Sequence, residues 1–309
     1  MKKPFFSVVI PTYNQAKFLK IALRSVFSQT FKNFEIIVID NYSNDKTQEL
    51  LKKYKKKIIL KKIRNRGVIA KSRNLGIKLA RGEWISFLDS DDYWSKNKLS
   101  EVYKIINEKT CDSICHSEWI SNREKKNYRV WSYGPYTNNF YKTLLKFGGR
   151  VSTSATTVKK NFIIKNNILY DENYKFITAE DYSFFMKIAK KKGVFIFINE
   201  PLGHHLFHEK SASSTYSKHH KAIEEVIKYH ILKVQKFEKD KKKLWNEINS
   251  FYSLKEKLFG LKTEFSNQKK VNLFSLFFQY PFNVMNFLSY ILIKRTKEII
   301  IYFFFKTKN

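Results

Sequence analysis

Strand-like and helix-like segments alternate through the first part of the chain, and this alternation constrains the fold more than any other feature. Short apolar runs rich in β-branched or aromatic residues predict strands at 6–10, 35–39, 58–60 and 84–88. Helical spacing and helix-ending signals predict helices between them, at 18–26, around 50–51 and at 70–80. Such alternation indicates an α/β fold with a mostly parallel sheet and right-handed crossovers. Because ligands of these sheets bind beyond the carboxyl ends of the strands, we expect one site to contain Pro11, Thr12, Asp40, Asp89 and Asp91.

Three carboxylates, Asp89, Asp91 and Asp92, directly follow the apolar run at 84–88. Like charges crowded at the end of a buried strand repel one another unless a cation or hydrogen-bond donors compensate them. An Asp-x-Asp pair, with water and phosphate oxygens, offers the hard ligands that Mg²⁺ and Mn²⁺ prefer. The same residue types are also common in turns. Taken alone, these residues leave a metal site and a turn equally open.

Five short motifs occur in order along the chain. They are VVIPTYN at 8–14, Ile39-Asp40 with Ser43 and Asp45, Arg73-Asn74 with Gly76, Asp89-Ser90-Asp91, and Glu180-Asp181. Together they resemble the motifs of glycosyltransferase family 2, and the resemblance covers about the first 215 residues. It implies a GT-A fold and transfer of a sugar from a nucleotide-diphosphate donor, usually a UDP-sugar, with inversion at the anomeric carbon.

The resemblance places the donor site at the strand ends. It implies that Asp40 accepts a hydrogen bond from the uracil ring, that Asp89 contacts the ribose or the metal, and that Asp91 binds the metal on the diphosphate. The other nucleotide-sugar residues implied are Pro11, Thr12, Tyr13, Arg73 and Ser90. A divalent cation, Mg²⁺ or Mn²⁺, would neutralise charge on the departing UDP. As alternatives, Asp40 also fits a helix cap and Arg73 a solvent-facing helix arginine.

Glu180 and Asp181 precede apolar residues at helical spacing, so they are expected at the start of a helix. A carboxylate at a helix N-terminus is stabilised as the anion, which suits a base that must be ionised before reaction. By the resemblance, Asp181 removes the proton from the acceptor hydroxyl, and Glu180 is the second catalytic candidate. Helix capping alone is the alternative for both acids.

His208, followed by serines, resembles a family histidine that completes the metal shell or contacts the diphosphate. Leu206 stands where the family often has an arginine, which leaves the diphosphate contacts of this loop open. As an alternative, His208 belongs to a surface group with His204 and His205. Asp92 has no role implied by the family and is expected to cap the helix that follows it.

Length and composition indicate one catalytic domain with an extension. The chain has 309 residues, of which 43% are apolar, enough to bury a full domain core. We expect a GT-A domain at 1–215 and a helical, amphipathic extension at 216–309. No signal peptide is expected, because the first strand begins almost at once. Cys111 and Cys115 fit packed thiols in a reducing cytosol; a metal site shared with His116 would lack a second ligand cluster.

The net charge of +32 has two interpretations: an anionic binding partner, or a general bias of the composition toward lysine. No nucleic-acid-binding motif is present, so no nucleic-acid partner is expected. The run at 271–293 lacks charged residues and lies between basic pairs, and a second apolar cluster follows at 299–305. This pattern favours a segment lying in the interface of an anionic membrane. Packing of the same residues on the catalytic domain or on another subunit is the alternative.

The predicted function is transfer of a single hexose, with glucose favoured, from a UDP-sugar to a polyprenyl-diphosphate-linked oligosaccharide. The enzyme would act peripherally at the cytoplasmic face of the inner membrane. In this the chain is similar to the branching glucosyltransferases of bacterial lipid-linked N-glycan assembly. Processive synthases are disfavoured, because their Gln-x-x-Arg-Trp motif and clear spanning helices are not evident. The alternatives are a family 2 transferase for lipopolysaccharide or capsule, an inactive membrane scaffold, and a basic nucleic-acid binder.

Overall fold

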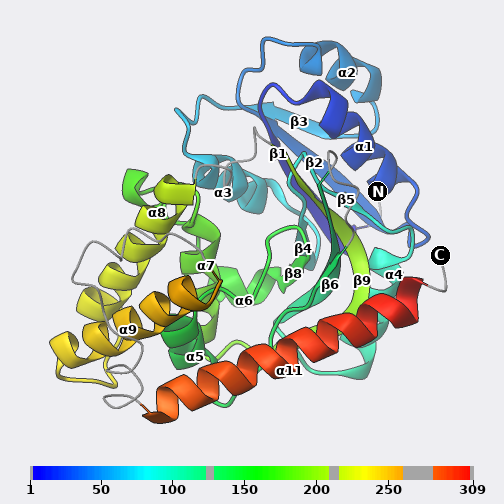
Figure 1. Cartoon of the computed structure of the whole chain (residues 1–309). Coiled ribbons are helices and arrows are strands. Elements are labelled where there is room, and N and C mark those ends of the chain that lie inside the picture. The colour runs from blue at the N-terminus through cyan, green and yellow to red at the C-terminus, as the bar shows by residue number, and fades with distance from the viewer. Residues whose placement is uncertain (1–2, 123–128, 209–215, 260–280, 307–309) are drawn as a thin grey trace.

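The computed structural model describes residues 3–122, 129–208, 216–259 and 281–306. Within these ranges the strands form one sheet in the order β3-β2-β1-β4-β8-β6-β9-β5, and β7 pairs with β6 (Figure 1). The strands are β1 (Phe6–Thr12), β2 (Phe34–Asp40), β3 (Ile59–Lys62), β4 (Trp84–Phe87), β5 (Tyr93–Trp94), β6 (Ser113–Asn122), β7 (Arg129–Trp131), β8 (Thr156–Lys159) and β9 (Phe195–Phe207).

Helices cover both faces of this sheet. The α-helices described are α1 (Ala16–Phe27), α2 (Thr47–Tyr54), α3 (Ile69–Leu79), α4 (Lys98–Glu108), α5 (Phe140–Phe147), α6 (Lys160–Lys165), α7 (Glu180–Lys190), α8 (Tyr216–Tyr229), α9 (Lys241–Phe259) and α11 (Pro281–Lys306). A short 3₁₀ helix, η1 (Tyr174–Phe176), precedes α7, and a π-helical turn, η2 (His230–Val234), continues α8.

The half of the sheet built from the first strands is parallel, as the sequence predicts. β1 pairs with β2 and β4, and β2 pairs with β3, all in parallel. Beyond β4 the sheet changes character, because β8 lies antiparallel between β4 and β6. The long strand β9 then pairs in parallel with β6. The predicted α/β fold is confirmed. Because β8 lies next to β4, the loop that leads into β8 contacts Asp89.

The continuous apolar strands divide their side chains between two cores. Val8 and Ile36 face the core under α1, α2 and α4, whereas Val9 and Ile37 face the core under α3, α5 and α7. This follows from the two-residue period of a strand that is covered on both faces. Gly76 lets α3 approach β1 closely, since a Cβ atom there would lie 2.2 Å from Cγ1 of Val9.

The segment after residue 215 packs on the same core as the strands. Apolar side chains of α8, η2 and α9, among them Val226, Ile231 and Leu244, belong to the core that also contains Val9 and Phe87. The predicted boundary at 215 therefore lies within one continuous hydrophobic core. It stays a prediction, because the packing of the core does not mark where a domain ends.

Helix α11 runs along the lower side of the molecule in Figure 1 and packs on β7, β9 and α9. Ile301 contacts Trp119 and Val130, and Glu298 accepts a hydrogen bond from the backbone N–H of Ser132 (3.2 Å). Of the uncharged run predicted at 271–293, residues 271–280 lie outside the described residues, and the rest begins α11. Among the described helices, none has the length and hydropathy needed to cross a membrane.

Candidate active site

The carboxyl ends of β1, β2 and β4 bring the predicted donor residues to one edge of the sheet. Thr12 and Asp40 are paired residues in the β1–β2 register, and β4 ends just before Asp89. Pro11 and Thr12 are buried, and Tyr13 is 53% exposed. Thr12 Oγ1 is buried without a hydrogen-bond partner among the described residues.

Asp40 is fully buried and organises the loop between β2 and α2. Its Oδ1 accepts from the N–H (3.1 Å) and the hydroxyl (2.5 Å) of Ser43, and its Oδ2 accepts from Nε2 of Gln48 (2.7 Å). Asp45 accepts from the N–H groups of Ala16 and Thr47, at the starts of α1 and α2. The Ser43 contacts stay within the loop, and Asp40 does not cap α2, whose N-cap is Lys46. One acceptor position of Oδ2 is left over.

Arg73, on α3, is a buried cation that connects two predicted parts of the site. Its guanidinium donates to Asp89 (2.7 Å) and to Glu180 (2.6 Å), and its side chain is 4% exposed. Burial alone would lower the pKa of Arg73, but the carboxylates of Asp89 and Glu180 outweigh burial and raise it well above its usual value. Arg73 is therefore not a solvent-facing helix arginine.

Glu180 and Asp181 occupy the first turn of α7, as predicted. Asp181 accepts from the N–H of Tyr182 (2.7 Å) and from the hydroxyl of Thr153 (3.3 Å). Burial raises the pKa of both carboxyl groups, and Arg73 opposes the rise. The expected stabilisation of the anion by the helix N-terminus is thus outweighed by desolvation, which makes Asp181 a stronger base than an ordinary aspartate.

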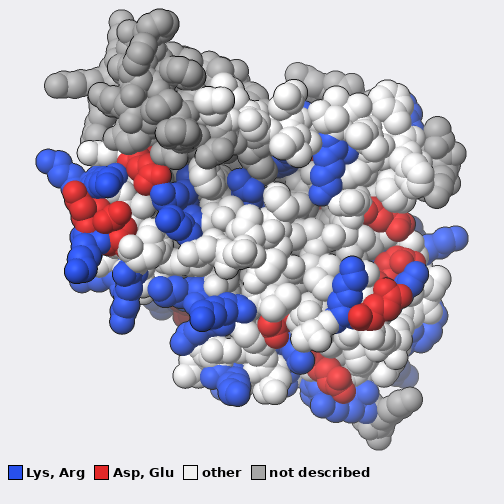
Figure 2. Space-filling model, turned by 90° about the horizontal axis from the view of Figure 1, so that it is seen from below, with Lys and Arg blue, Asp and Glu red and all other residues white. Residues whose placement is uncertain are grey.

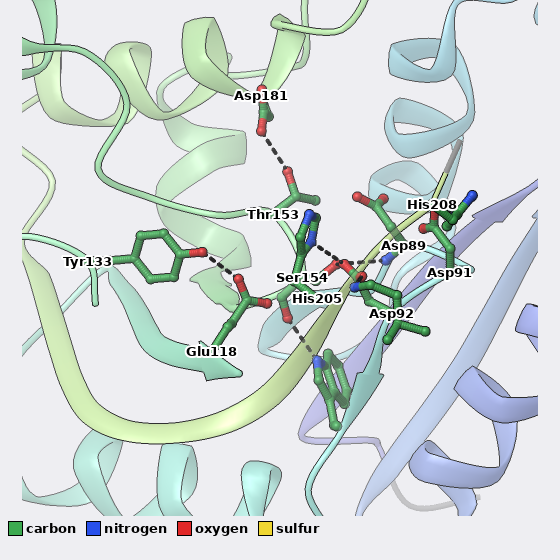
Figure 3. Close-up of polar contacts among 12 residues, drawn as sticks. Asp89, Asp91, Asp92, Glu118, Tyr133, Thr153, Ser154, Asp181, His205 and His208 are labelled. Carbon is green, nitrogen blue, oxygen red and sulfur yellow. Dashed lines mark hydrogen bonds and ion pairs between the residues drawn. The ribbon is translucent and has the colours of Figure 1, made fainter. Parts of the chain in front are cut away.

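Asp91 and His208 lie together, with 3.0 Å between Oδ2 and Nε2 (Figure 3). The ring of His208 also stacks on Phe18 and its side chain is 12% exposed, so it is not one of a surface group of histidines. Within the described residues, no three His, Cys, Asp or Glu side chains form a preformed metal cluster. A carboxylate and an imidazole nevertheless fit two positions of a Mn²⁺ or Mg²⁺ shell whose other ligands are phosphate oxygens and water.

The expected capping role of Asp92 is wrong, because the N-cap of α4 is Asn97. Asp92 is 2% exposed and accepts from the hydroxyl of Ser154 (2.5 Å) and the N–H of Leu206 (3.1 Å), with His205 Nδ1 at 3.2 Å. Burial would lower the pKa of His205, but Asp92 outweighs it and raises the pKa to about 10. Asp92 and the imidazolium of His205 form an ion pair whose carboxylate is buried and whose imidazole is 28% exposed.

Sequence reasoning missed Ser154, Thr153 and His205, which Figure 3 places between the Asp89–Asp91 side and Asp181. Ser90, which it did predict, donates to Oε1 of Gln15 at the start of α1 and is buried. Five of the six residues at 152–157 carry a hydroxyl group, a local signal that could have drawn attention to this segment.

The thiols of Cys111 and Cys115 are free and buried, as interpreted from the sequence. Burial raises their pKa values to about 11 and about 12.

The fold is that of the GT-A class of glycosyltransferases, as two solved structures show. TarS from Staphylococcus aureus (residues 1–349, with UDP-GlcNAc) matches with a TM-score of 0.60 over 87% of this chain and 76% of that chain, at 23% identity. The mannosyltransferase PcManGT from Pyrobaculum calidifontis, with GDP-Man and Mn²⁺, matches with a TM-score of 0.52 over 97% of this chain and 88% of that chain, at 15% identity. At these identities the likeness establishes the fold.

The chain belongs to glycosyl transferase family 2, whose model matches residues 7–166. WfaP from Escherichia coli, a UDP-Glc:alpha-D-GlcNAc-diphosphoundecaprenol beta-1,3-glucosyltransferase, is 32% identical over 60% of this chain and 70% of its own. The uncharacterized glycosyltransferase MJ1057 from Methanocaldococcus jannaschii is 31% identical over 65% of this chain and 70% of its own. The predicted family, fold and enzyme class are confirmed.

Proposed function

We propose that this protein transfers one hexose, with glucose as the first candidate, from a UDP-sugar to a hydroxyl group of a polyprenyl-diphosphate-linked oligosaccharide. The observation that carries the proposal is the position of Arg73, whose guanidinium joins Asp89 on the donor side to Glu180 beside Asp181. Family membership supports the reaction class. The donor and acceptor in the name of WfaP support glucose and a lipid-linked acceptor.

The donor nucleotide would lie over the ends of β1 and β2. Tyr13 is exposed there, and the buried Thr12 hydroxyl would gain the partner that it lacks among the described residues. The open acceptor position on Asp40 Oδ2 would accept the ring N–H of uracil. Pro11 and Ser90 would line the same pocket. The guanidinium of Arg73 would hold Asp89 beside the sugar and the diphosphate.

The chemistry is a single displacement at the anomeric carbon. Asp181 takes the proton of the acceptor hydroxyl as that oxygen bonds to the anomeric carbon, and the bond between this carbon and the β-phosphate oxygen breaks. The electron pair leaves with UDP, and the configuration inverts. Held by Asp91 and His208, Mg²⁺ or Mn²⁺ would neutralise the charge that develops on the diphosphate.

We propose further that the enzyme works at the cytoplasmic face of the inner membrane, with α11 lying on the anionic surface. Among the described side chains of α11, eight that are large and apolar are solvent-exposed: Met285, Leu288, Leu292, Ile293, Ile299, Ile300, Phe303 and Phe304. Exposed apolar patches of this kind mark interaction surfaces. Figure 2, which views the molecule from below, shows broad uncharged areas with Lys and Arg side chains around and between them. Apolar burial and basic residues together suit an anionic bilayer.

A donor screen tests the enzymatic proposal. The protein is incubated with UDP-, GDP- and CMP-sugars and a GlcNAc-diphosphate lipid, with Mn²⁺, Mg²⁺ or EDTA, and released nucleotide and glycan product are measured. We expect UDP release and product from UDP-glucose, abolished by EDTA. Product from a different donor would correct the sugar, and product with a different lipid-linked acceptor would favour lipopolysaccharide or capsule synthesis. Absence of turnover with every donor would favour the inactive scaffold.

A further inference from the structure

Ser154 lies at the junction of the two sides of the site, in the loop that leads into β8 (Figure 3). Its hydroxyl donates to Oδ2 of Asp92 (2.5 Å) and accepts the backbone N–H of Asp89 (3.1 Å). Its carbonyl oxygen accepts from Nε1 of Trp94 (2.8 Å). Because an ionised carboxylate only accepts, these contacts fix the direction of the serine hydroxyl.

The neighbouring residue reaches the opposite side of the site. Thr153 donates its hydroxyl to Oδ2 of Asp181 (3.3 Å), and both Thr153 and Ser154 are buried, at 4% and 1% exposure. Two consecutive residues therefore contact the proposed base and the backbone of the Asp89–Asp91 turn. We call Thr153, Ser154 and Asp92 the hydroxyl clamp.

Asp92 extends the clamp to β9, the strand that ends just before His208. It accepts the N–H of Leu206 and contacts His205, two and three residues before His208 in the chain. His208 in turn contacts Asp91. The clamp thus holds both the turn that carries Asp91 and the strand end that precedes its partner.

We propose that Ser154 and Thr153 are positioning residues that set the separation between Asp181 and the Asp91–His208 pair. This rests on the proposed function, in which Asp181 takes a proton from the acceptor while Asp91 and His208 act on the leaving diphosphate. The clamp residues take no proton and contact no substrate in that scheme; Thr153 acts through the base, by its hydrogen bond to Oδ2 of Asp181. Its effect is on geometry, where a displacement of about 1 Å can cost roughly 10²-fold in rate.

The test compares Ser154→Ala and Thr153→Val with Ser154→Thr, which keeps the hydroxyl group. We expect the two hydroxyl-deleting variants to lower kcat for transfer by roughly tenfold or more, while UDP affinity changes less than about threefold. Ser154→Thr should recover most of the rate. Ser113→Ala is the matched control, because it deletes a hydroxyl that is buried in β6 and has no hydrogen-bond partner among the described residues.

A purely structural role predicts a different result, namely equal losses of transfer, donor hydrolysis and UDP binding that follow the folded fraction. That result, or parental kinetics in both deletion variants, would overturn the proposal. Hydrogen exchange gives a readout that does not require turnover, since the Asp89 amide should lose protection in Ser154→Ala. Unchanged protection would overturn the clamp. An inactive parent with lost protection would instead count against the proposed function alone.

Discussion

Arg73 shows how one buried residue holds the site together before any substrate binds. Its charge is shared by Asp89 and Glu180, and Asp181 lies next to the second of these. Removing one member of such a group leaves an uncompensated buried charge, which is strongly destabilising. In Arg73 variants, a loss of activity caused by misfolding would therefore not be separable from a loss caused by impaired catalysis. Sharper tests at the residue scale use Asp91 and Asp181, which do not pair directly with it.

Asp91→Asn should uncouple UDP binding from the metal. The amide is a poorer ligand for a divalent cation than the carboxylate. The factor by which Mn²⁺ increases UDP affinity should therefore be roughly tenfold smaller in the variant than in the parent. Calorimetric titration with UDP, with Mn²⁺ or with EDTA, measures this. Asp240→Asn, the same change at the start of α9, should behave as the parent. A Mn²⁺ response in Asp91→Asn equal to that of the parent would remove Asp91 from the metal site.

Asp181→Asn should separate binding from chemistry. The amide keeps the shape of the side chain but cannot take a proton, so kcat should fall by roughly 10²-fold or more with UDP affinity preserved. Single-turnover transfer rates and UDP titrations measure the two quantities. If transfer continues near the parental rate, the base lies elsewhere, with Glu180 the next candidate.

The pH dependence of transfer gives a second check on Asp181. Burial raises the pKa of Asp181, Arg73 opposes the rise, and Asp89 adds to it. A base must be ionised, so kcat should fall as pH falls through this raised pKa, above the ordinary aspartate value of about 3.9. The profile of kcat against pH should show this acidic limb in the parent and lose it in Asp181→Asn. A limb that persists in the variant would belong to another group.

At the level of single residues, the sequence predicted the site residues whose neighbours in the chain reveal their position at the end of a strand or the start of a helix. Asp89 and Asp91 follow an apolar run, and Glu180 and Asp181 precede a helical pattern, so both pairs were predicted. The partners of Asp92 were not, because Ser154 and Leu206 reach it only through strand pairing far along the chain. Its position just before a helix therefore suggested a cap that the structure does not contain.

Among the elements, α3 depends on its close contact with β1. Gly76→Ala would place a Cβ atom 2.2 Å from Cγ1 of Val9, so the helix must move or the valine must leave its packed position. We expect a loss of roughly 1–3 kcal/mol in the free energy of unfolding, measured by urea denaturation. Gly149→Ala is the matched control, because its Cβ would meet nothing closer than 3.8 Å. Equal stability of both variants would contradict this account.

The parallel half of the sheet was predictable because each strand there is followed by its own helix. The pairing of β5 with β9 and the insertion of β8 between β4 and β6 were not, since neither has a local signal in composition or period. In the extension, the uncharged run at 271–293 suggested the membrane segment. In the structure, the exposed apolar face of α11 also includes Ile299, Ile300, Phe303 and Phe304, which belong to the second apolar cluster noted at 299–305.

For the whole molecule, the net charge of +32 and the exposed face of α11 predict binding to anionic membranes, which vesicle sedimentation measures. We expect the protein to sediment with anionic vesicles and to dissociate in part at high salt, which screens the basic residues. Replacing Ile300 and Phe303 by Asp should weaken binding by roughly tenfold or more, because two apolar side chains no longer enter the interface. Tyr174→Asp, at an exposed aromatic residue outside α11, is the control. Unchanged sedimentation of the α11 variant would rule out this docking face.

The place of β8 in the sheet has a consequence for folding kinetics. β8 completes the contact between β4 and β6, and Thr153 and Ser154 lie in the loop before it, so the site exists only after a pairing between distant parts of the chain. Such pairings form late, because loop closure costs entropy before the contacts form. During refolding, transfer activity should therefore return after most of the helical circular dichroism signal; simultaneous recovery would contradict this order. Transfer activity would then require the completed sheet, and a chain with only its parallel half folded would be inactive.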